Sequence, residues 1–149
     1  MKKVIIIFSV IIIFLGVVCT KFVCEKTYLQ NGIDDMFDHS YQSLILNMWN
    51  MSEHDYDESQ LKVMNTDNTK YGEFLSRLFQ YTSYNNNYEL GTIVQILDQS
   101  SGNDSCLSLT IDKELYDKLA ELNGKFDSIS LAESVRKTIE KKNIQIRTE

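Results

Sequence analysis

Acidic and imidazole side chains that stand close together are the residues of this chain most able to do chemistry. Asp34, Asp35 and Asp38 place carboxylates up to four residues apart, a spacing that brings two of them to one helix face, where they could share a divalent cation. His39 follows directly, and His54 stands in an acidic loop, so either could add an imidazole ligand. The chain has only two histidines, and carboxylates in a first helical turn complement the helix dipole. We therefore predict solvated polar faces here, with no metal and no cofactor.

Motifs for nucleophilic or phosphate chemistry are missing from the sequence. It has no glycine-rich phosphate loop, no serine nucleophile elbow, no HExxH pair and no cysteine and histidine spacing typical of a metal site. We therefore predict that the protein is not an enzyme and has no catalytic residues.

Two of the three cysteines could pair. Cys19 lies inside an apolar run, which leaves Cys24 and Cys106. Outside the cytoplasm these two could form a disulfide that closes a long loop, worth about 3–5 kcal/mol on the chain-entropy model. Because Cys24 ends the apolar run and Cys106 opens a predicted strand, two unpaired thiols fit the sequence equally well.

The elements that would position these residues begin with an apolar run after Met1-Lys2-Lys3. It covers Val4–Thr20, seventeen residues without a charge, and makes a helix of about 25 Å, or about 30 Å if Lys21 extends its ammonium to water and residues up to 23 join. This predicts a transmembrane signal anchor over residues 1–23 that contacts membrane lipid through residues 4–23. A cleaved signal peptide is the alternative, although the run is long for one and the only candidate cleavage site, after Cys19, is a poor one.

Orientation follows from the lysines at the two ends of this run. Lys2 and Lys3 stand against Lys21 and Lys26, a thin margin, but a three-residue head cannot hold a folded domain. We therefore predict a single-pass protein of the cell membrane with residues 24–149 outside the cytoplasm. With a cleaved signal peptide the protein would instead be secreted.

The charge of the remaining chain is acidic and unevenly spread. Residues 21–149 carry 21 acidic and 13 basic residues, and residues 27–105 carry most of the excess. Such a surface repels phosphate backbones at long range, which argues against nucleic-acid binding as the main role. About 125 residues can bury one modest core, so we expect one compact domain or two tightly joined subdomains.

Apolar periodicity predicts helices in the first half of this domain. Between Ile33 and Trp49 apolar residues recur at steps of three and four, with Gly32 separating this helix from the anchor. A second stripe runs from Tyr71 to Phe79, with Asp67 or Thr69 as its cap, and residues 83–87 then break the pattern.

The second half changes toward a strand pattern. Residues 90–97 are rich in β-branched side chains, and residues 107–111 alternate apolar and polar, with a turn-forming loop between them. Two further helices follow, capped by Asp112 and Ser130 and separated by a break at Asn123-Gly124. We therefore predict an α+β fold, in which the transmembrane helix precedes a small domain of about four helices and a short β-hairpin.

Residues 106–143 form a strand-helix-helix unit that resembles the ribbon-helix-helix family of DNA-binding repressors. In that family two subunits pair their strands into a ribbon that enters the major groove, and the second helix holds a phosphate at its N-terminus. The resemblance implies that Ser108 and Thr110, with Cys106, would contact bases and that Ser130 would bind phosphate. The family usually has a basic residue where this chain has Cys106, and the unit is net neutral.

Taken together, the anchor, the acidic surface and the missing catalytic motifs favour a non-enzymatic role. We predict binding or assembly at the outer surface of the cell membrane, with an unidentified protein partner and with homodimers as a further option. The alternatives are a ribbon-helix-helix DNA-binding regulator that uses residues 106–143 and a secreted effector with a cleaved signal peptide.

Overall fold

Five helices make up the part of the chain that the structure describes. The computed structural model describes the backbone of residues 2–101 and 109–146, and the side chains of residues 11–101 and 109–142. The helices are α1 (Lys2–Glu53), α2 (Glu58–Phe79), α3 (Tyr88–Ser100), α4 (Lys113–Leu122) and α5 (Ile129–Ile146). Within these described ranges no residue belongs to a β-strand.

The prediction of an α+β fold with a β-hairpin is therefore wrong. Residues 90–97, expected as its first strand, lie inside α3, where Leu90, Ile93, Val94 and Leu97 are buried. These four residues have the i, i+3, i+4, i+7 spacing of one helix face, and in so short an apolar run the helical period and β-branched composition compete. Of the second expected strand, residues 109–111 are described, and they lie in neither helix nor strand.

The prediction of a transmembrane anchor is also wrong. In the stretches whose side chains are described, no helix is both long enough and apolar enough to cross a bilayer. This finding contradicts the anchor over residues 1–23 and the single-pass location in the cell membrane.

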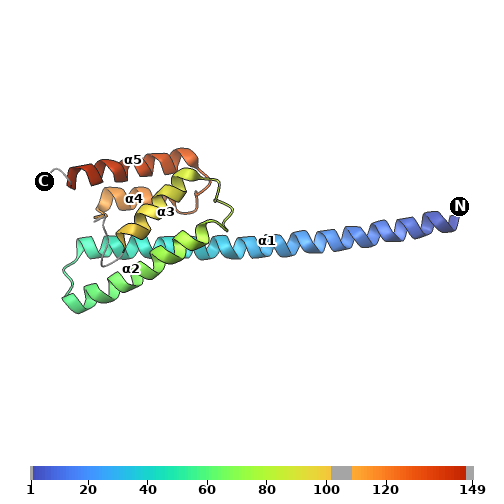
Figure 1. Ribbon diagram of the computed structural model, residues 1–149, viewed down its shortest axis with the longest axis horizontal. Coiled ribbons are helices and arrows are strands. Elements are labelled where there is room, and N and C mark those ends of the chain that lie inside the picture. The colour runs from blue at the N-terminus through green and yellow to red at the C-terminus, as the bar shows by residue number, and fades with distance from the viewer. Residues whose placement is uncertain (1, 102–108, 147–149) are drawn as a thin grey trace.

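One continuous helix replaces the two that were predicted at the N-terminal end. α1 runs without interruption across residues 23 and 24 and through Gly32, so the prediction that Gly32 separates two helices is wrong. A Cβ at Gly32 would meet no atom within 4 Å, so this glycine neither breaks the helix nor fills a close contact. Figure 1 shows α1 extending far beyond the other four helices, with the chain's N-terminus at its free end.

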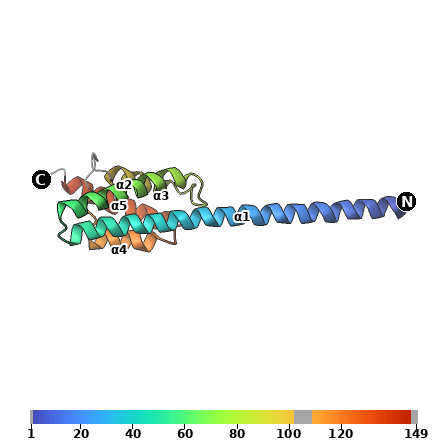
Figure 2. The same cartoon turned by 90° about the horizontal axis from the view of Figure 1, so that it is seen from below.

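The C-terminal half of α1 and the other helices pack in a ring. α1 contacts α2 and α4, α2 contacts α3, α3 contacts α5, and α5 contacts α4. The two perpendicular views in Figures 1 and 2 place all four shorter helices around the same end of α1. The predicted helix stripe between Ile33 and Trp49 is confirmed as the face of α1 that enters this ring, through Phe37, Tyr41, Leu44, Ile45 and Met48.

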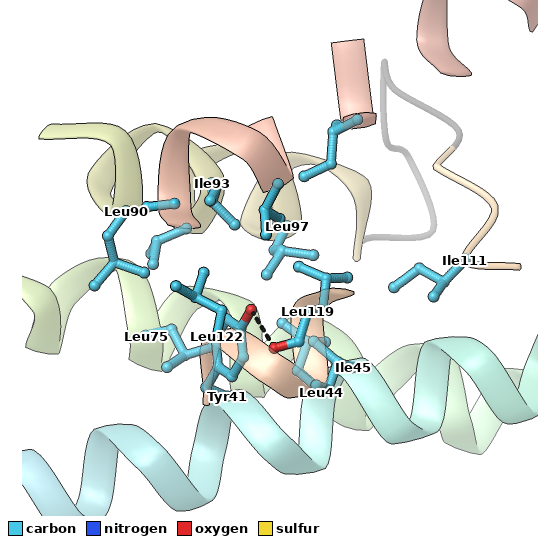
Figure 3. Packing of buried hydrophobic residues seen from close by; sticks show 14 of the residues in the cluster. Tyr41, Leu44, Ile45, Leu75, Leu90, Ile93, Leu97, Ile111, Leu119 and Leu122 are labelled. Atoms are coloured by element: carbon cyan, nitrogen blue, oxygen red, sulfur yellow. Dashed lines mark hydrogen bonds between the residues drawn. The ribbon is translucent and has the colours of Figure 1, made fainter. Parts of the chain in front are cut away.

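The core inside the ring is aliphatic at its centre and aromatic at one end. Figure 3 shows Tyr41 of α1 among leucines of α2, α3 and α4, with its hydroxyl pointing at α4. That hydroxyl donates to the carbonyl oxygen of Leu119 at 3.2 Å, and burial raises the pKa of Tyr41 well above its ordinary value, so the donor proton stays in place. Phe37 and Phe126 meet edge to face with ring centroids 5.2 Å apart.

Side-chain caps fix where most helices begin. Asp57 accepts from the Gln60 amide in a capping box, and Asp112 accepts from the Leu115 amide, as predicted for Asp112. The predicted caps Asp67 and Thr69 lie inside α2, because its polar first turns were not recognised as helical. α5 begins at Ile129, so the predicted cap Ser130 lies inside the helix, and the Leu131 amide donates to Ser128 instead.

Two glycines and one ion pair help to determine how neighbouring helices pack. A Cβ on Gly72 of α2 would lie 2.4 Å from the Ser101 hydroxyl and 3.0 Å from Cα of Asp98, so α2 and α3 pack closely only because residue 72 has no side chain. Glu89 of α3 pairs with Arg136 of α5, which fixes the next pair of helices in the ring. Gly124 takes the left-handed conformation, φ 75°, in the turn predicted between α4 and α5.

Candidate functional site

A cavity of about 470 Å³ lies between α2, α3 and the loop that joins them, and we call it the α2–α3 cavity. It falls within the range of roughly 300–1,000 Å³ that is common for small-molecule pockets. Its lining side chains come from three segments and share one property, which is that none is charged: Ser76, Phe79, Asn85, Asn86, Tyr88, Gly91, Thr92, Val94 and Gln95.

Phe79 and Gly91 shape the inner wall of this cavity. A Cβ on Gly91 would lie 2.9 Å from Cε1 of Phe79, so the phenyl ring occupies the space that any other residue would fill. On its other side the ring meets Phe37 of α1, with centroids 6.1 Å apart. The ring is thereby held against α3.

Some polar side chains around the α2–α3 cavity make hydrogen bonds within the protein, and others do not. Ser76 donates to Asp98 at 2.5 Å, Thr92 donates to the Tyr88 carbonyl, and Asn85 donates to the Gln80 carbonyl. The side chains of Asn86 and Gln95 make no hydrogen bond to any residue that the structure describes. These two amides therefore have donors and acceptors free to meet a ligand.

The second candidate site is the N-terminal part of α1, which leaves the domain. We call residues 11–23 the apolar segment; its large side chains Ile11, Ile12, Ile13, Phe14, Leu15, Val17, Phe22 and Val23 are all exposed. The Thr20 hydroxyl donates to the carbonyls of Gly16 at 3.0 Å and Val17 at 2.9 Å, so this polar group is satisfied by its own helix. Apart from the charge of Lys21, the segment consequently presents an almost wholly apolar surface to its surroundings.

A smaller cavity of about 180 Å³ lies where α1, α2 and the end of α3 meet, next to Thr110. Asn68 is buried there, and its amide donates to the sulfur of Met51 at 3.2 Å. The amide oxygen of Asn68 and the hydroxyl of Ser100 are buried without a hydrogen-bond partner among the described residues. These groups could hold an ordered water, as buried polar groups commonly do.

The residues predicted for DNA contact are not gathered into a described ribbon. Cys106 and Ser108 lie outside the described residues. Thr110 is exposed in the segment before α4, and Ser130 is exposed in the first turn of α5. Base contacts by these residues therefore stay a prediction.

The predicted disulfide also depends in part on a residue outside the described ranges. The Cys24 thiol is exposed on α1, beyond the apolar segment, and Cys106 is not described. Their pairing stays a prediction.

The acidic residues that the sequence raised as metal ligands have structural roles or remain separate. Asp34 accepts hydrogen bonds from Gln30 at 3.1 Å and from the Ser83 amide at 2.9 Å, and so ties the loop after α2 to α1. His54 lies just after the end of α1, far along the chain from His39. Among side chains that the structure describes, no group of three or more histidines, cysteines or acids is placed to hold a metal ion.

The surroundings of Asp38 disfavour its charged form. One of its carboxylate oxygens is buried without a hydrogen-bond partner in the described chain. Burial raises the pKa of Asp38 above its ordinary value of 3.8, and the neighbouring charges of Asp34 and Asp35 raise it further. The charged form is thus disfavoured in the folded state, so ionisation of this group lowers the stability of the fold.

Replacing Asp38 with asparagine is expected to stabilise the fold near neutral pH. Because the folded pKa is raised, the contribution of Asp38 to stability is most favourable below pH 3.8 and is lost as the pH rises through the raised value. The gain of Asp38→Asn should therefore be present at pH 7 and vanish near pH 3, and should amount to a fraction of the roughly 1 kcal/mol typical of single substitutions. Urea unfolding at the two pH values measures it. Asp117→Asn, an exposed aspartate on α4, is the matched control, and equal pH dependence in both variants would contradict the prediction.

The sequence does not predict the α2–α3 cavity, because its pattern assigns one wall to a helix and the other to a β-strand. The pattern predicts the break at residues 83–87, but it predicts a strand over residues 90–97. In the structure these residues lie in α3, and this helix forms one wall of the cavity. Asn87 was the available signal. It is a preferred N-cap residue directly before a run with helical spacing, and in the structure its side chain accepts from the Leu90 amide.

Comparison with known proteins adds no relative to this picture. No protein-family model matches the chain, and neither a curated protein nor a solved structure does. A function must therefore be argued from the described residues themselves.

Proposed function

We propose that this chain is a non-enzymatic assembly protein, in which several copies associate through the apolar segment and each presents its helical domain. The observation that carries the proposal is the exposure of apolar side chains all the way around α1 in residues 11–23. An assembly role is the form of the predicted binding function that these residues support best.

Apolar residues surround the helix in this segment. Ile11, Ile12, Ile13, Phe14 and Leu15 are consecutive and are between 48 % and 67 % exposed. Since successive residues of a helix are about 100° apart, five in a row cover its whole circumference. A helix that is apolar all round is buried in the functional state of a protein, and each such side chain gains about 1.5–3 kcal/mol when fully buried.

Further copies of the chain are the occupant we infer for this surface. Two helices in contact bury one stripe each, whereas an all-round apolar surface needs neighbours on several sides, so we expect three or more copies. Gly16 presents open space, with no atom within 4 Å of a Cβ built there, which lets a neighbouring helix approach closely.

Charges at the C-terminal end of the apolar segment fit such an assembly. Lys21 and Glu25 form an ion pair at 3.9 Å one turn apart, and both are well exposed. A helix that carries both signs beside an apolar stretch can exchange these pairs with a neighbour, as charged residues flanking an apolar seam do in coiled coils. Exposed pairs of this kind contribute little stability and mainly favour one alignment.

Measuring the mass of the full chain in solution tests the proposal. Sedimentation velocity without detergent, over a concentration series, should give particles of three or more times the chain mass of 17.3 kDa. The triple variant Ile12→Glu, Phe14→Glu, Val17→Glu places charges around the helix and should sediment as a monomer, while its far-UV circular dichroism keeps the signal of the folded domain.

A matched control separates the apolar segment from exposed apolar residues in general. Val63 of α2 is 61 % exposed but lies on the domain, so Val63→Glu should leave the assembly intact. A wild type that is monomeric at every concentration would overturn the proposal. It would equally fail if the assembly dissociated on addition of phosphatidylcholine vesicles and the monomers bound them, since lipid would then be the occupant.

A further inference from the structure

We propose that the α2–α3 cavity binds a neutral, polyhydroxylated ligand, that is, a mono- or disaccharide. This inference is independent of the assembly role, because it rests on a different part of the chain. It depends on the cavity's uncharged lining, its two unused amides and its exposed aromatic ring.

The lack of charge selects the class of ligand. Every residue that lines the cavity is uncharged, although the chain as a whole has a net charge of −6. A phosphate or carboxylate ligand would find no cation to pair with here and would meet an acidic protein at long range. A cationic ligand would find no carboxylate in the lining. A neutral ligand needs no group of opposite charge, so it is the class of ligand that this lining favours.

The polar side chains that make no hydrogen bond within the protein favour a ligand that carries hydroxyl groups. A hydroxyl both donates and accepts, and a side-chain amide offers a donor and an acceptor side by side. Asn86, in the loop, and Gln95, on α3, both line the cavity, and neither side-chain amide makes a hydrogen bond to a described residue. Two amides that face one volume can therefore bind several hydroxyls of one ring at once.

The aromatic ring at the rim supplies the apolar contact that a sugar needs. Tyr88 is 80 % exposed although it stands in the first turn of α3, beside the cavity. The face of a pyranose ring carries C–H groups, which pack against an aromatic face, while its hydroxyls point outward to polar partners. Phe79, which lies against Gly91 and near Phe37, adds a second aromatic side chain to the lining.

Titration of the full chain with neutral sugars tests the proposal. The probes are cellobiose, maltose, lactose and N,N′-diacetylchitobiose at up to 50 mM, followed by the side-chain amide signals of Asn86 and Gln95 in ¹H–¹⁵N spectra. At least one sugar should shift both amides saturably. Glucose 6-phosphate and cellobiouronic acid, which carry a charge, should bind at least tenfold more weakly than the best neutral sugar.

Three variants separate the cavity from the rest of the surface. Tyr88→Ala should weaken binding of that sugar about tenfold, whereas Tyr88→Phe, which keeps the ring, should change it less than about threefold. Tyr81→Ala removes a tyrosine that is 60 % exposed outside the cavity and should leave binding unchanged. No saturable shift with any sugar, equal binding of a charged sugar, or equal loss in the two alanine variants would each overturn the proposal.

Discussion

Replacing Phe126 with alanine is expected to lower the free energy of unfolding by about 3–5 kcal/mol, the range measured for large aromatic residues in cores. The ring is 1 % exposed although it belongs to the turn between α4 and α5. It meets the rings of Phe37 at 5.2 Å, Tyr41 at 4.9 Å and Tyr84 at 5.2 Å between centroids. One side chain thus joins α1, the loop after α2 and the α4–α5 turn, and its loss leaves a cavity between three segments.

A loss of this size is about a fifth or more of the stability of an ordinary small domain, which is about 5–15 kcal/mol. Urea unfolding at one fixed protein concentration, followed by circular dichroism, measures it, since association would shift the apparent stability. Phe74→Ala is the matched control, because Phe74 of α2 is exposed and should cost less than about 1 kcal/mol. Equal losses in the two variants would show that the aromatic group does not hold the fold together.

Phe126 also shows why the sequence reveals only part of this fold. It stands between Lys125 and Asp127 in a polar turn, outside any helical or strand period, so no pattern places it in the core. Its burial follows from the ring of helices, which turns the α4–α5 connection inward over Phe37 and Tyr41. A tertiary arrangement of this kind is not encoded in local spacing.

Local spacing did predict the elements with long amphipathic stripes. The stripe of α1 in residues 33–49, the cap at Asp112 and the turn at Gly124 are confirmed, because each depends on neighbours within a few residues. The run at residues 90–97 failed because its branched residues favour strand while its spacing favours helix, and burial against α2 and α5 decided the competition.

The candidate sites were predicted less well than the helices. The α2–α3 cavity depends on how two consecutive helices pack against each other, above all on the fit of Phe79 against Gly91, which helix periodicity does not specify. The sequence did mark residues 11–23 as unusual, since the apolar run is visible in composition alone. It gave them the wrong environment: their large apolar side chains are exposed, and no helix in the stretches with described side chains could cross a bilayer.

Asn87 is the second residue whose loss should strongly destabilise the fold. The residue is 4 % exposed, and its side chain accepts one hydrogen bond and donates another. The amide oxygen accepts from the Leu90 amide at 3.2 Å and caps α3, while the amide nitrogen donates to the carbonyl of Phe126 at 2.8 Å. Asn87 therefore starts one helix and holds the turn that carries the central aromatic ring.

Asn87→Ala is expected to cost about 2–4 kcal/mol of unfolding free energy. Loss of an N-cap typically costs about 0.5–2 kcal/mol, and a buried carbonyl left without a donor costs about 1–3 kcal/mol more. Asp57→Ala is the control for the first of these effects, because Asp57 caps α2 at an exposed position. Urea unfolding should show a larger loss for Asn87→Ala, and an equal loss would mean that the bond to Phe126 contributes nothing.

Asn87→Asp separates the two hydrogen bonds by pH. Aspartate keeps the acceptor that caps α3, but its ionised form cannot donate to the Phe126 carbonyl and places a charge where almost no water reaches. We expect the pKa of this aspartate to be raised, so the variant should be least stable near pH 7 and should recover as the pH falls and the carboxyl gains a proton to donate. The wild type has no titratable group at this position and should not show this recovery. A variant that is equally stable at pH 4 and pH 7, relative to wild type, would show that the donor to Phe126 is dispensable and that capping alone explains the residue.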